Sequence, residues 1–134
     1  MGVSPGAVAD TSYYIAHESG RPVRGDDVPP EVAVSVVTIA ELRVGVHAAA
    51  DERTRALRQE TLDAARGATI LDIDSDVAEV WAEMRVHLAA SGRRVHVNDL
   101  WIAATAAVHH LPVVTQDDDF DPVLGVRGLE IVKV

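Results

Sequence analysis

Short apolar runs alternate with longer amphipathic segments along the chain. The runs are bounded by turn and capping residues, and several are rich in β-branched side chains, which favours strands. The expected strands cover 7–9, 32–37, 69–73, 113–115 and 129–132. Helical spacing of apolar residues, with capping residues at the helix starts, predicts helices between them. The expected helices follow Asp10 and cover 38–50, 51–65, 75–90 and a small-residue segment from Asn98 or Asp99 to about 109.

This alternation of strands and helices indicates parallel strands joined by right-handed crossovers. We therefore expect an α/β fold, a three-layer α/β/α sandwich around a central, mostly parallel and twisted sheet. No internal repeat or linker interrupts the pattern. We expect a single domain over residues 1–134.

Composition limits the chemistry. The 134 residues include no cysteine, which excludes disulfides and thiolate metal sites. No basic segment leads into an apolar run at the N-terminus, and no apolar stretch approaches the roughly 20 residues that cross a bilayer. We expect a cytoplasmic protein without a membrane partner.

The formal net charge of −9 argues against broad electrostatic adhesion to nucleic acid, which needs many basic residues. A nucleic acid partner would have to be held locally. The acidic excess is either a solubilising surface or a set of carboxylates gathered around bound cations.

Four acids recur at corresponding places in the predicted fold. Asp10 and Asp117 follow apolar strands, Glu41 lies one turn into the helix after the second strand, and Asp99 stands at a helix start. Each has an ordinary explanation as a cap, a solvated helix edge or a turn residue. In open parallel sheets, however, the functional crevice lies beyond the carboxyl ends of the strands, so all four are expected on one edge.

Such a group of carboxylates suits Mg²⁺ or Mn²⁺. These cations take oxygen ligands, and clustered carboxylates repel one another unless a cation neutralises them. A cation held there can polarise a phosphodiester and lower the pKa of a bound water. The expected chemistry is metal-dependent phosphodiester hydrolysis.

Four segments carry a family resemblance: Val-Ala-Asp-Thr-Ser at 8–12, Val-Val-Thr-Ile-Ala-Glu-Leu at 36–42, Asn-Asp-Leu-Trp-Ile-Ala-Ala at 98–104, and Val-Thr-Gln-Asp-Asp-Asp-Phe at 114–120. With these segments the chain resembles the PIN-domain nucleases, and among them the VapC toxins of toxin–antitoxin pairs. The resemblance implies a PIN-like fold and a Mg²⁺- or Mn²⁺-dependent endoribonuclease.

Site roles follow from the resemblance. It implies that Asp10 and Asp99 are the principal metal ligands, that Glu41 helps to hold metal or water, and that Asp117 completes the quartet. Asp119 is the alternative fourth acid, because three acids follow one another there. The implied supporting residues are Thr11 and Ser12 for the first acid, Thr115 for the last, and Asn98.

Partners also follow from the resemblance. It implies an RNA substrate, a homodimer, and a VapB-type antitoxin that wraps the toxin and places a basic residue in the acidic pocket. Arg93 and Arg94 either complement a helix C-terminus or grip RNA phosphates beside the metal. Trp81 and Trp101 are expected in core or dimer contacts rather than base stacking.

Some basic residues and histidines have plainer interpretations. Arg53, Arg55 and Arg58 are expected on a solvated helix face. The histidines show no zinc-binding spacing, so they are not expected as metal ligands.

Two other functions compete. A receiver-like phosphoacceptor domain is also an α/β fold with acids at strand ends, but it needs a lysine near its last crossover. The single lysine, Lys133, comes at the extreme terminus, and Asp10 has no adjacent acidic partner. A catalytically silent PIN-like binding module is the second alternative, although no member of the quartet is missing.

Overall fold

A computed structural model describes residues 4–134. At its centre is a five-stranded sheet with the strand order β3-β2-β1-β4-β5. The strands are β1 (Ala7–Ala9), β2 (Val32–Ser35), β3 (Thr69–Leu71), β4 (Val113–Thr115) and β5 (Ile131–Lys133). All four neighbouring pairs are parallel.

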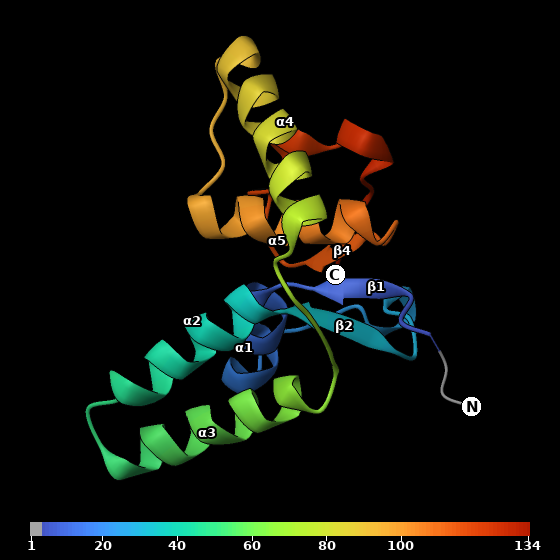
Figure 1. The fold of residues 1–134 in the computed structure, drawn as a ribbon. Coiled ribbons are helices and arrows are strands. Elements are labelled where there is room, and N and C mark those ends of the chain that lie inside the picture. Colours follow the sequence, from blue (N-terminus) through green and yellow to red (C-terminus); the bar gives the residue numbers. More distant parts are fainter. Residues whose placement is uncertain (1–3) are drawn as a thin grey trace.

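The helices form a layer on each face of this sheet (Figure 1). They are α1 (Thr11–Ser19), α2 (Val36–His47), α3 (Glu52–Arg66), α4 (Ser75–Ser91) and α5 (Val97–Val108), with 3₁₀ turns at Gly25–Asp27, Asp121–Val123 and Val126–Gly128. Figure 1 shows α1, α2 and α3 on one side of the sheet and α4 and α5 on the other. The predicted three-layer α/β/α fold is confirmed.

Successive strand residues serve the two layers alternately. Val8 and Val113 belong to the core under α4 and α5, whereas Ala9 and Val34 pack toward α1, α2 and α3. All four side chains are fully buried. Because both faces of a parallel sheet are covered at its centre, β1 is apolar throughout, and β2 and β4 are apolar up to their last residues, Ser35 and Thr115.

The predicted second strand is two residues too long. Val36 and Val37 were expected in it from their β-branched side chains, but α2 begins at Val36. The Ser35 hydroxyl accepts a hydrogen bond from the Val37 backbone N–H at 3.1 Å. This N-cap outweighs the strand preference of valine. The third strand is also shorter than predicted, and the last strand lies slightly later in the chain.

The start of α5 also differs from the prediction. Neither Asn98 nor Asp99 caps it, because His96 is the N-cap and its Nδ1 accepts from the Asn98 backbone N–H at 3.3 Å. Asp99 is therefore the third residue of the helix, and its carboxylate is not used for capping. A negative charge in this first turn interacts favourably with the helix dipole.

Two arginines of α3, predicted on a solvated face, also contact the end of α2 and the loop after it, and the Arg55 side chain stays 42% exposed. Arg58 donates to the Gly45 carbonyl at 2.7 Å and Arg55 to the Ala49 carbonyl at 3.2 Å. Arg53 is exposed, as expected. Part of the contact between α2 and α3 thus consists of hydrogen bonds from guanidinium groups to carbonyls near the end of α2, which have no partner within the helix.

The strand order reverses between β1 and β4. The chain builds outward from β1 through β2 to β3, then returns across α4 and α5 to place β4 on the other side of β1. Such a reversal leaves a crevice beyond the carboxyl ends of the two central strands. Within residues 4–134, no helix combines the length and apolar character that a membrane span requires.

Candidate active site

Asp10 directly follows β1 and is the most deeply buried acid of the molecule. Only 2% of its surface is exposed. Its Oδ2 accepts a hydrogen bond from the Thr115 hydroxyl at 2.7 Å, and its Oδ1 accepts from the Ser12 hydroxyl at 2.8 Å and the Tyr13 backbone N–H at 3.1 Å. Asp10 therefore caps α1 and also joins β1 to β4.

Burial dominates the protonation of Asp10. It raises the pKa from 3.8 to about 6, although hydrogen bonds from Thr115, Ser12 and Tyr13 act in the opposite direction. The negative charge of Asp117 raises the pKa further. A neighbouring cation would stabilise the ionised form of a carboxylate in such surroundings.

Asp99 shows that the other acids share the same pocket. Its pKa is also raised to about 6, first by burial and then by the charges of Asp10, Asp119 and Glu41. His96 acts in the opposite direction. Charges from β1, α2, α5 and the segment after β4 therefore meet at one place, which is the arrangement that the sequence predicted.

Glu41 is held by hydroxyl groups. Its Oε1 lies 2.7 Å from the Thr11 hydroxyl, which is 3.1 Å from the hydroxyl of the buried Thr38. Thr11 thus supports Glu41 and not Asp10, in contrast to the role implied by the resemblance. Thr38 was missed from the sequence, although it precedes Glu41 by three residues and therefore lies on the same helix face.

The segment after β4 is attached to the Asp10 cluster through its backbone. The Gln116 N–H donates to the Ser12 hydroxyl and the Asp117 N–H to the Thr115 hydroxyl, both at 3.0 Å. The Thr115 hydroxyl therefore donates a hydrogen bond to Asp10 and accepts one from the Asp117 backbone. The hydrogen bond to Asp10 was not foreseen, because the resemblance implied that Thr115 supports only the last acid.

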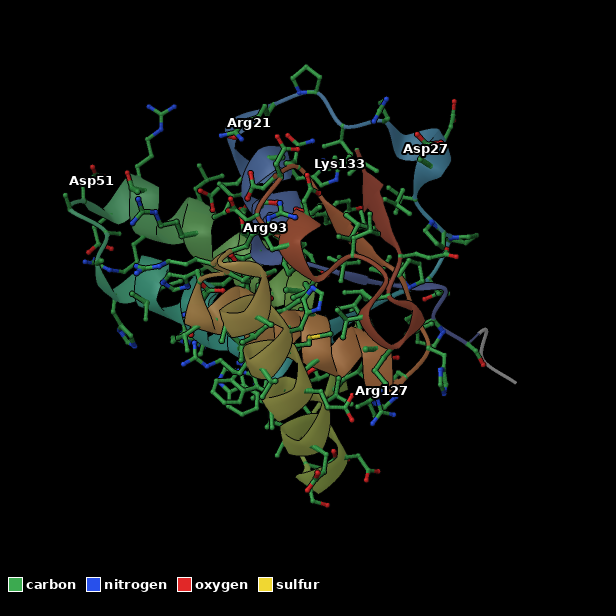
Figure 2. All side chains as sticks on the ribbon, turned by 90° about the horizontal axis from the view of Figure 1, so that it is seen from above. Arg21, Asp27, Asp51, Arg93, Arg127 and Lys133 are labelled. Carbon is green, nitrogen blue, oxygen red and sulfur yellow. The ribbon has the colours of Figure 1, made fainter. Side chains whose placement is uncertain are left out.

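Lys133 forms ion pairs with two of the acids in this segment and not with the other two. Its ammonium group contacts Asp118 at 2.6 Å and Asp121 at 2.9 Å, leaving Asp117 and Asp119 near the pocket. Figure 2 shows Lys133 and Arg21 on the same side of the molecule. The charge of Arg21 lowers the pKa of Asp117, whereas burial and Asp119 raise it more. Neither cation was identified from the sequence.

Within residues 4–134, the remaining predicted residues have no hydrogen bond or ion pair with the acids. Arg93 and Arg94 are exposed in the loop between α4 and α5, and Asn98 is half-buried at the start of α5. In the part of the chain that the structure describes, the Asn98 side chain makes no hydrogen bond to the quartet. Its backbone contributes to the helix cap instead.

The donors in the pocket suit a hard divalent cation. Among residues 4–134, no three acidic or histidine side chains stand close enough to enclose an ion as they are placed. The carboxylates nevertheless raise one another's pKa, so a cation would relieve their repulsion and let them approach. Asp10, Asp99, Glu41 and either Asp117 or Asp119 offer the oxygen ligands that Mg²⁺ and Mn²⁺ prefer.

The fold and this acidic pocket agree with a known class. The family model described as PIN domain matches residues 7–123. The chain therefore belongs to the PIN-domain family.

Individual relatives place it more narrowly. Over 135 aligned residues the chain is 53% identical to Ribonuclease VapC5 of Mycobacterium tuberculosis, covering all of both proteins. It is 42% identical to Ribonuclease VapC4 of the same species, over 93% of this chain and 96% of VapC4. A crystal structure of VapBC-5, a toxin–antitoxin system of that species, matches with a TM-score of 0.89 and 50% identity over 96% of this chain and 98% of that one. Within the PIN-domain family, the chain belongs with the VapC proteins.

The raised pKa of Asp10 predicts how stability depends on pH. The folded metal-free protein binds this proton more tightly than the unfolded chain does. The free energy of unfolding therefore falls as pH rises from 3.8 to about 6, by ~3 kcal/mol for this group. Urea denaturation in EDTA at several pH values should show the fall in the wild type and a flatter profile in Asp10→Asn. Parallel profiles for the two proteins would contradict the prediction.

Proposed function

We propose that this chain is a Mg²⁺- or Mn²⁺-dependent endoribonuclease that acts as the toxin of a toxin–antitoxin pair. The observation that carries the proposal is the mutual repulsion of acids from four separate chain segments around the buried Asp10. A folded protein keeps such a costly arrangement where a bound cation uses it. The named ribonucleases among the relatives support RNA as the substrate.

The four acids have different roles in this proposal. Asp10 and Asp99 would hold the ion, because their pKa values are the most strongly raised among the acids. The charge of Asp10 also raises the pKa of Asp99. Glu41 would hold the ion or a water through Oε2, since Thr11 contacts Oε1. When bound, the ion supplies Lewis acidity toward the phosphodiester and lowers the pKa of a bound water.

Neither alternative function gains support from the site. A receiver-like phosphoacceptor would need a lysine directed at Asp10, but Lys133 contacts Asp118 and Asp121. A silent binding module would have no use for a buried carboxylate with a raised pKa. A metal-dependent hydrolase would use this carboxylate as a metal ligand.

Neutralising the principal acids should abolish cleavage. With Mg²⁺ or Mn²⁺, wild-type protein should cut structured RNA, and Asp10→Asn or Asp99→Asn should slow the cut by on the order of 100-fold or more. Asp26→Asn is the matched control, because it removes the same charge from an exposed 3₁₀ turn. Cleavage rates measured on labelled RNA decide, and wild-type rates in Asp10→Asn would refute the proposed role of the acids.

The fourth acid can be assigned by metal affinity. We expect Asp117→Asn to weaken Mn²⁺ binding more than Asp119→Asn, because Asp117 is half-buried, its backbone is fixed by Thr115 and its charge reaches Asp10. Asp119 is exposed but reaches Asp99 electrostatically. Calorimetric titration of each variant with Mn²⁺ gives the comparison. A larger loss in Asp119→Asn would make Asp119 the fourth ligand.

The antitoxin would bind across the α1–α2 layer in this proposal. A hollow of about 260 Å³ lies there, lined by Ile15, Leu42 and Glu41 among others, and Ile15 and Val44 are exposed apolar side chains nearby. The VapBC-5 structure is that of a toxin–antitoxin system, which supports a VapB-type partner here. A basic side chain of the partner would enter the acidic pocket beside Glu41.

Growth measurements test the toxin role. Expressed in the cytoplasm of a bacterium, the wild type should arrest growth, whereas Asp99→Asn, made to the same level, should not. Co-expression of the antitoxin encoded beside the gene should restore growth. Equal harmlessness of the wild type and Asp99→Asn would contradict the role. The expected homodimer stays a prediction that light scattering can check.

A further inference from the structure

A surface hollow at the end of α4 is lined by three arginines. It measures about 490 Å³ and lies where α4 ends and the loop to α5 begins. The lining residues are Arg85, Leu88, Ala89, Gly92, Arg93, Arg94 and Val95. No acidic side chain is among them.

Within residues 4–134 the three arginines form no ion pair, whereas four other cations of the molecule do. Arg24, Arg55, Arg127 and Lys133 each form an ion pair. Over residues 4–134, no carboxylate lies within ion-pair distance of Arg85, Arg93 or Arg94. On a chain with a net charge of −9, three unpaired guanidinium groups around one hollow form a local positive field that suits an anion.

Aromatic packing fixes one of these guanidinium groups. Arg85 lies over the Trp81 ring at 5.6 Å from its centroid, and Trp81 stacks on Trp101 with centroids 4.7 Å apart. Both tryptophans pack against the core, as the sequence predicted. Arg85 is thus attached to a rigid surface and loses little further freedom when it binds a ligand.

The loop that lines the hollow leads into α5, the helix that carries Asp99. Figure 1 shows the loop after α4 running down to the beginning of α5, where Asp99 is the third residue. Arg93 and Arg94 belong to this loop, and Trp101 follows Asp99 by two residues on the same helix. A strand bound in the hollow can therefore extend along the loop toward the acids.

We propose that Arg85, Arg93 and Arg94 bind the phosphodiester backbone of the RNA substrate and guide it into the acidic pocket. The assignment rests on the proposed ribonuclease function and names the part of the surface that holds the substrate. Guanidinium forks match phosphate oxygens in a bidentate manner. Phosphate contacts also position nucleic acid without reading its sequence, which suits a site at a distance from the cut.

RNA binding without cleavage gives the test. In an Asp99→Asn background with EDTA, anisotropy of a fluorescein-labelled RNA hairpin should show binding weakened on the order of tenfold by Arg93→Gln/Arg94→Gln. The slope of log affinity against log salt should fall by about 1.4, or roughly 0.7 for each lost phosphate contact. Arg53→Gln/Arg66→Gln removes the same charge from exposed positions of α3 and should leave both quantities unchanged.

Intrinsic fluorescence locates the binding. Trp81 and Trp101 are the only tryptophans of the chain; Arg85 of the hollow lies over the Trp81 ring, and Trp81 stacks on Trp101. Unlabelled RNA should change their emission in the Asp99→Asn protein and in the α3 control. The change should be lost in Arg93→Gln/Arg94→Gln. Since all four substituted arginines are exposed, melting temperatures should agree among the variants.

The outcomes separate this inference from the proposed function. Failure of the wild type to cleave RNA would overturn the function. Cleavage by the wild type, with equal RNA binding by the two double variants, would overturn the arginine site alone. If Arg93→Gln/Arg94→Gln kept RNA binding but lost the antitoxin in co-purification, the hollow would be a protein interface and the RNA assignment would be wrong.

Discussion

The site depends on the hydrogen bonds that hold the buried Asp10 carboxylate. An ionised carboxylate away from water is costly unless hydrogen bonds or a cation compensate it. Ser12, Thr115 and the Tyr13 N–H supply hydrogen bonds, and the first two hydroxyls also accept from the backbone that follows β4. One group of hydroxyls thus joins β1, α1 and β4 and fixes the position of the next acid.

Hydrogen bonds do not compensate Asp10 fully, and the neighbouring acids increase the cost. Its pKa stays near 6, and Asp99, which senses Asp10, Asp119 and Glu41, shows a similar value. This unfavourable charge density is what makes the pocket suitable for a divalent ion. The charge density lowers stability locally, and the rest of the α/β core, with Val8, Val34 and Val113 fully buried, tolerates the loss.

Across residues 4–134, the ion pairs of the molecule leave the pocket acids without a basic partner. Lys133 forms ion pairs with Asp118 and Asp121, whereas Asp117 and Asp119 raise the pKa of Asp10 and Asp99, respectively. Arg85, Arg93 and Arg94 remain without acidic partners beside the loop that leads to α5. The same net charge of −9 therefore coexists with a local surface that suits RNA.

The sequence by itself determined the layers, the order of strands and helices, and the edge where Asp10, Glu41, Asp99 and Asp117 meet. Periodicity and strand alternation are local signals, and parallel sheets place the ends of their strands together. Only the tertiary structure decided the partners: Thr11 supports Glu41, Thr115 serves two acids, and Lys133 selects among three successive aspartates. Hydrogen bonds and ion pairs between residues about 15 to 105 positions apart leave no trace in local pattern, because they depend on how the layers pack.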